Sequence, residues 1–85
     1  MPKRSVTAEK QLQQILKQSV HLEFNGNREV IIEDCCGILE YTENQVRINT
    51  SDYILRFQGK NLKLCTMTSD SIVLKGHIEH MDFLF

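Results

Sequence analysis

Long apolar runs, proline and an excess of charge of one sign are all scarce in this 85-residue chain. Apolar runs such as Val30-Ile31-Ile32 are far shorter than the roughly 20 residues that a membrane-spanning helix needs. Residues 5–14 are mainly polar, so no secretory signal is predicted. The formal net charge of −1 gives no electrostatic footprint of a nucleic-acid-binding domain. We therefore expect one cytoplasmic domain without a transmembrane segment.

Cysteine is too scarce and too unevenly spaced for a set of paired disulfides. Two of the three cysteines are adjacent in sequence, which fits a reducing compartment better. Adjacent cysteines in an extended segment point to opposite faces, and no Cys-x-x-Cys pair exists. The pattern therefore predicts no metal and no cofactor. It favours ordinary thiols and surface histidines over a zinc site. The residues that such a site could use are Cys35, Cys36, Cys65, His21, His77 and His80.

No catalytic constellation is evident either. A nucleophilic cysteine needs a nearby histidine and a third group that orients it, and the sequence shows no such proximity. The glycines are isolated instead of forming a phosphate-binding cluster. We interpret them as structural turns, at Gly26, Gly37, Gly59 and Gly76. The chain is therefore not expected to be an enzyme.

The N-terminal part, residues 1–19, is predicted to be a tail followed by a short amphipathic helix over 7–19. Its apolar residues fall on one side at helical spacing, at Ala8, Leu12, Ile15 and Leu16. A stripe this narrow favours packing against the chain's own domain. Binding to a membrane surface or to a groove on a partner is the alternative.

From Val20 onward the hydrophobic period changes to two, which indicates strands over residues 20–85. Asn25-Gly26-Asn27 predicts a tight hairpin turn. Further polar reversals are expected at 34–37, 43–44, 50–52, 58–61 and 68–70, with a bulge or bend at Gly76. The alternation then slips, and a bulge near His80 would restore it.

These patterns predict an all-β fold: a small antiparallel β-sandwich or roll of about seven or eight short strands, with the short N-terminal α-helix. The short reversals favour antiparallel pairing because they leave no room for helical crossovers. A small RNA-binding barrel and a β-solenoid are alternatives. Such a barrel generally has about five strands, fewer than the seven or eight predicted here. The turns are typical of hairpins, which disfavours a solenoid.

Several segments, in order and spacing, resemble the YabP/YqfC family of bacterial sporulation proteins, and the short length with a helical extension is closer to YqfC. The segments are Asn25-Gly26-Asn27-Arg28-Glu29, Gly37-Ile38-Leu39-Glu40-Tyr41-Thr42, Arg47-Ile48-Asn49-Thr50, Gln58-Gly59-Lys60-Asn61-Leu62, Leu74-Lys75-Gly76-His77-Ile78 and Asp82-Phe83. The resemblance implies a β-sandwich-like, non-enzymatic protein that acts in the mother cell during endospore formation. Its cysteines depart from the family's usual pattern.

The leading hypothesis is therefore a structural or interaction module with a protein partner or a second copy of itself. The candidate interaction surface comprises the two apolar ends of the chain, at Leu12, Ile15, Leu16, Phe83 and Phe85. No small-molecule substrate is evident. The alternative is a small nucleic-acid-binding barrel that uses Tyr41, Tyr53 and Phe57 beside Arg47, Arg56 and Lys63, although the shared parity of Tyr53, Leu55 and Phe57 favours a core role.

Overall fold

The computed structural model describes residues 20–35 and 37–85, in which the regular structure is β-strand. The strands are β1 (His21–Asn25), β2 (Glu29–Glu33), β3 (Gly37–Tyr41), β4 (Gln45–Asn49), β5 (Ile54–Met67) and β6 (Ser71–Leu84). They form one six-stranded sheet in the order β1-β2-β6-β5-β4-β3, and every pairing is antiparallel. The predicted all-β antiparallel fold is confirmed. The predicted helix over 7–19 lies outside the described residues.

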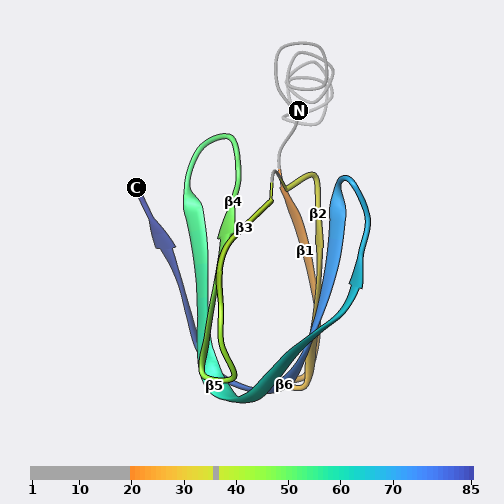
Figure 1. Cartoon of the computed structure of the whole chain (residues 1–85), viewed down its shortest axis with the longest axis vertical. Coiled ribbons are helices and arrows are strands. Elements are labelled where there is room, and N and C mark those ends of the chain that lie inside the picture. Colours follow the sequence, from red (N-terminus) through yellow and green to blue (C-terminus); the bar gives the residue numbers. More distant parts are fainter. Residues whose placement is uncertain (1–19, 36) are drawn as a thin grey trace, which may run out of the picture.

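Two long strands fold this sheet onto itself. β5 and β6 have 14 residues each, and they pair with each other along nearly their whole length. β2 pairs only with residues 71–75 of β6, whereas β4 pairs only with residues 54–58 of β5. The β1–β2 hairpin and the β3–β4 hairpin therefore lie on different layers of a sandwich, which appear as the two arms joined by β5 and β6 in Figure 1.

β-Bulges allow β5 and β6 to stay paired where the sheet bends from one layer into the other. Gln58 pairs with His80 but Gly59 pairs with Ile78, which leaves Glu79 as an extra residue on β6, beside the predicted position. The predicted reversal at 58–61 is wrong, because β5 runs through it with a further register shift. The described residues consequently form six strands, fewer than predicted.

The backbones of β5 and β6 approach so closely at this bend that two positions require glycine. A Cβ added at Gly76, where φ is +136°, would lie 2.6 Å from the carbonyl oxygen of Asn61 on β5. A Cβ at Gly59 would overlap the carbonyl oxygen of His77 on β6. Both glycines therefore lie where the paired long strands bend and bulge, with no room between them for a side chain.

The two hairpin turns are hydrogen-bonded to the long strands near the bend that contains Gly59 and Gly76. The β1–β2 turn contacts β6, where Gly76 N–H donates to the Arg28 carbonyl at 3.0 Å and Ile78 N–H to the Asn27 carbonyl at 2.8 Å. The β3–β4 turn contacts β5 through Gly59 N–H to Asn44 at 3.0 Å and Leu62 N–H to Glu43 at 2.8 Å. Each hairpin is thus fixed to its own long strand.

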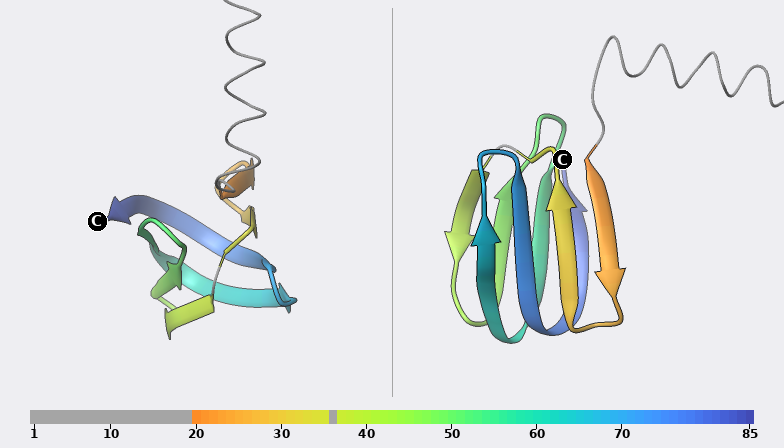
Figure 2. Two further views of the ribbon diagram at one scale, coloured as in Figure 1. Left: turned by 90° about the horizontal axis from the view of Figure 1, so that it is seen from above. Right: turned by 90° about the vertical axis from the view of Figure 1, so that its right-hand side faces the viewer.

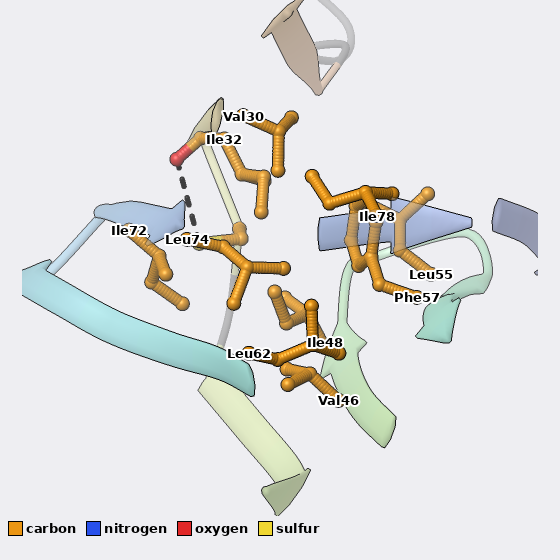
Figure 3. Packing of buried hydrophobic residues seen from close by; sticks show 11 residues of the cluster. Val30, Ile32, Val46, Ile48, Leu55, Phe57, Leu62, Ile72, Leu74 and Ile78 are labelled. Carbon is orange, nitrogen blue, oxygen red and sulfur yellow. Dashed lines mark hydrogen bonds between the residues drawn. The ribbon is translucent and has the colours of Figure 1, made fainter. Parts of the chain in front are cut away.

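The core lies between the two layers and follows the predicted alternation. One layer contributes alternate residues of β2 and the first half of β6, and the other contributes alternate residues of β4 and the first half of β5 (Figure 3). Burial of each large side chain stabilises the fold by roughly 1.5–3 kcal/mol. The buried apolar residues are Val30, Ile32, Cys35, Val46, Ile48, Leu55, Phe57, Leu62, Ile72, Leu74 and Ile78.

Candidate interaction surface

Polar contacts join the two layers along one side of the sandwich, although Tyr41 there stays 48% exposed. β3 bounds this side in one layer and the second half of β5 bounds it in the other. Tyr41 on β3 pairs with Val46, and its hydroxyl oxygen accepts a hydrogen bond from the backbone N–H of Leu64 on β5 at 3.2 Å. Together with the contacts of the β3–β4 turn, this bond satisfies backbone donors on the edge of β5 that faces away from β6, beyond the last residue that pairs with β4.

The opposite side is open and apolar. It is bounded by β1 in one layer and by the second half of β6 in the other, which lies behind β1 and β2 in Figure 2 (right). Leu22 and Phe24 are the register partners of the buried Ile32 and Val30, so their side chains share the inner face. Phe24 nevertheless stays 43% exposed.

The facing wall has the same character. Met81 and Phe83 on β6 are the register partners of the buried Phe57 and Leu55, and Phe83 stays 44% exposed. We refer to the space bounded by Leu22 and Phe24 on one wall and Met81 and Phe83 on the other as the opening. Phe24 takes the place next to its turn that Tyr41 takes in the other hairpin, but phenylalanine has no hydroxyl to bond across the layers.

Both walls of the opening are sheet edges. Within residues 20–35 and 37–85, β1 pairs with β2 alone. Residues 79–84 of β6 pair with β5 alone, and the contacts of the β1–β2 turn reach β6 only as far as Ile78 among the described residues. Edges with unpaired N–H and C=O groups attract another chain segment unless something covers them.

An aromatic cluster lies at the C-terminal end of the opening. The ring of Tyr53 contacts those of Phe83 and Phe85 edge to face, with centroid distances of 5.1 and 5.7 Å. Phe85 is 98% exposed. We call Tyr53, Phe83 and Phe85 the aromatic cluster. Phe83 and Phe85, predicted as part of the interaction surface, are thus brought together, whereas Leu12, Ile15 and Leu16 lie outside the described residues.

The outer face of the β3–β4 layer is polar and internally neutralised. Arg47 donates from Nε to Glu40 Oε1 at 2.7 Å, across the β3–β4 pair. On the neighbouring strands Arg56 makes two bonds to Asp82, from Nε to Oδ1 at 3.0 Å and from Nη2 to Oδ2 at 2.6 Å. Gln45 also donates to Glu40 Oε1, at 2.8 Å. This face consists of matched charges in a hydrogen-bonded row.

These contacts set the acidity of the two carboxyl groups. The hydrogen bond from Gln45, followed by that from Arg47, lowers the pKa of Glu40 below its ordinary value. The hydrogen bond from Arg56 lowers the pKa of Asp82 and raises the pKa of the guanidinium. Both carboxylates are therefore held ionised beside their arginines, which suits a structural role and not that of a proton donor near neutral pH.

The arrangement gives no support to the nucleic-acid alternative. Arg47 and Arg56 are each bonded to a carboxylate, so neither presents an uncompensated charge to a phosphate. Lys63 lies on the other half of β5, opposite Lys75 on β6. Phe57 is fully buried and thus cannot stack on a base.

The thiols and imidazoles are dispersed over the described residues. Cys35 is buried, with Sγ 3.8 Å from the Asp70 carbonyl oxygen, and Cys65 is exposed. Cys36 lies outside the described residues. The nearest carboxylates to the histidines are Glu23 for His21, Glu79 for His77 and Asp82 for His80, at 4.0, 3.6 and 3.8 Å. Within 20–35 and 37–85, no group of three His, Cys, Asp or Glu side chains could hold a metal ion.

The YabP family model matches residues 17–84, which is most of the chain. The chain belongs to the YabP family. Comparison with curated proteins and with solved structures finds no significant match. Membership of this family is consistent with a sporulation-associated protein. The closer similarity to YqfC stays a prediction.

The match places the whole opening inside the YabP-family region, because that region contains both β1 and β6. A hydrophobic period of two predicts that Leu22 and Phe24 share one face of a strand, but it does not predict the 43% exposure of Phe24. That exposure depends on β1 being an edge strand, which a hydrophobic period does not reveal. No helix in the described part of this YabP-family chain is long and apolar enough to span a membrane.

Proposed function

We propose that this chain is a non-enzymatic sporulation protein that acts in the cytoplasm of the mother cell during endospore formation. It is a structural or interaction module, and it contacts a protein partner or a second copy of itself through the aromatic cluster. Family membership supports the sporulation role.

The exposed aromatic cluster is the observation that carries the proposal. Aromatic side chains dominate the binding energy of protein interfaces because they bury a large area at a small cost in conformational entropy. Here Phe85 is 98% exposed, and it lies beside Phe83 at a sheet edge. The charged outer face offers no comparable anchor, since its arginines are already bonded to Glu40 and Asp82.

The test is complementation in the spore-forming bacterium that carries this gene. Deletion of the gene should lower the number of heat-resistant spores, and the intact gene should restore it. The Phe85→Asp variant should fail to restore it, because a charge in the cluster prevents burial against a partner. Since Phe85 contributes nothing to the core, this variant should fold normally, which circular dichroism checks.

The matched control is Met67→Asp, which introduces the same charge at another apolar side chain, 63% exposed at the end of β5. It should restore spore formation. Normal spores after deletion would refute the sporulation role. Equal restoration by the Phe85 and Met67 variants would refute the assignment of the contact surface.

A further inference from the structure

The free edge of β1 carries a row of side chains that is complementary to itself. Residues 20–24 read Val-His-Leu-Glu-Phe, with Leu22 at the centre. Val20, Leu22 and Phe24 share one face of the extended chain. His21 and Glu23 share the other face, and they are groups that attract each other: within one strand His21 Nε2 lies 4.0 Å from Glu23 Oε1. The row thus reads apolar on one face and oppositely charged on the other, from either direction.

Two copies of such a strand match when they run antiparallel about a two-fold axis between their Leu22 residues. Val20 of each copy then lies opposite Phe24 of the other copy. His21 of each copy lies opposite Glu23 of the other copy, so the favourable charge pair occurs twice. A two-fold axis perpendicular to the sheet keeps the inner faces of both copies on the same side. No like charges are brought opposite each other in this register.

β1 lacks devices that protect other free edges of the described fold. It pairs with β2 in unbroken register over its five residues, and it contains no lysine or proline. β3, at the other end of the sheet, has a bulge between Ile38 and Glu40. The part of β5 beyond β4 carries Lys63, and Tyr41 bonds to its backbone at Leu64. A regular edge without these devices is the kind to which another strand adds.

The edge of β1 is also accessible in the described fold. β1 is the outermost strand of its layer, and the second half of β6 lies behind β1 and β2 in Figure 2 (right) and not beyond them. Within β1 only Leu22 is partly buried, and the other residues are exposed. On the neighbouring strand β2, Val30 and Ile32 are fully buried. β1 therefore leaves most of its side-chain surface for contacts outside its own chain.

We propose that two copies of this chain form a dimer by antiparallel pairing of their β1 strands, with Leu22 opposite Leu22. The layers that contain β1 join into one continuous sheet. The openings of the two copies lie on the same side of this sheet, so Phe24 is covered by apolar residues of the second copy. Phe85 stays free, and the aromatic cluster is left to bind another protein. The dimer uses a different surface and goes beyond the proposed function.

Light scattering of the purified full chain over a range of concentrations tests the dimer. The measured mass should approach twice 9.9 kDa as the concentration rises. His21→Glu places like charges opposite each other twice and should raise the Kd of the dimer about tenfold or more. His21→Glu with Glu23→Lys restores opposite charges and should return the Kd to within about threefold of the parent value. Both positions are exposed, so circular dichroism should show unchanged strands in each variant.

Cysteine pairing tests the register. His21→Cys protein mixed with Glu23→Cys protein should give a disulfide-linked heterodimer, because the two positions lie directly opposite each other. Either protein alone should give little linked product, since identical positions are offset by about 7 Å along the strands. Both proteins carry Cys36→Ser and Cys65→Ser, and Cys35 is kept because it is buried. Mass spectrometry identifies the linked pair.

Phe85→Asp is the control for the other surface and should leave the Kd of the dimer unchanged. A chain that stays monomeric at all concentrations would overturn the proposal, as would a heterodimer no more abundant than the products of either cysteine variant alone. A dimer that Phe85→Asp abolishes would also overturn it, because the contact would then run through the aromatic cluster. None of these results depends on spore formation, so they stand apart from the complementation test.

Discussion

Replacement of Gly76 by alanine tests the bend in the paired strands β5 and β6, through which both strands pass from one layer to the other. Alanine there meets two penalties. The backbone has φ of +136°, and a strained backbone of this kind costs about 1–3 kcal/mol. The new Cβ would also lie 2.6 Å from the Asn61 carbonyl oxygen, and overpacking adds about 1–3 kcal/mol.

Gly37→Ala is the matched control for the backbone penalty. Gly37 has φ of +153°, and a Cβ there would have no atom within 4 Å. The difference between the two variants thus isolates the close approach of the strands. The free energy of unfolding of Gly37→Ala should exceed that of Gly76→Ala by about 1–3 kcal/mol.

Thermal unfolding of the full chain, followed by circular dichroism, measures this difference. For a domain of this size, 1 kcal/mol corresponds to about 4–8 °C in Tm, so Gly76→Ala should unfold at least about 4 °C below Gly37→Ala. Equal Tm values would show that the bend in β5 and β6 tolerates a side chain at position 76. The account of how β5 and β6 fold the sheet would then be wrong.

Three further predictions concern single contacts, each checked by urea unfolding. Tyr41→Phe removes the bond to Leu64 and should cost about 0.5–1.5 kcal/mol; unchanged stability would mean that this bond does not help to hold the two layers together. Leu55→Ala empties a fully buried site and should cost about 2–5 kcal/mol; a cost well below that would place Leu55 outside the core. Asp82 has a pKa lowered by Arg56, so the stability it contributes is present above the ordinary carboxyl value of 3.8 and is lost as the pH falls through the lower folded value. Asp82→Asn should therefore lose less stability than the parent between pH 7 and pH 3, and parallel pH profiles would contradict this reasoning.

Local patterns in the sequence identified much of the fold. The period of two from Val20 onward places Val30 and Ile32 on one face of a strand, and Val46 and Ile48 on one face of another, and these are the faces that are buried. Asn25-Gly26-Asn27 does form the turn between β1 and β2. The change in the hydrophobic alternation after Gly76 also corresponds to a bulge, at Glu79.

The wrong reversal at 58–61 has a physical cause. Gly59 and Asn61 are residues that favour turns, but here they let a long strand bend and bulge against β6. Asn61 has a positive φ of 55° within β5. A local pattern does not distinguish a bent strand from two short ones, because the difference lies in the partner strand.

The candidate surface was only partly predictable for the same reason. An apolar C-terminus was visible in Phe83 and Phe85, but its contact with Tyr53 depends on pairing between β5 and β6. The Arg56–Asp82 pair likewise joins residues 26 positions apart. Such long-range register is decided by the packing of whole strands and not by neighbouring residues.

The central claim is that the aromatic cluster is the surface through which this YabP-family protein makes its contact. Its most direct test is to place a photo-crosslinking amino acid at Phe85 in sporulating cells, with Leu39 on β3, which is 49% exposed, as the control position. The account predicts a cross-linked product heavier than the monomer from position 85 and none from position 39. No product from position 85, or equal products from both positions, would contradict it.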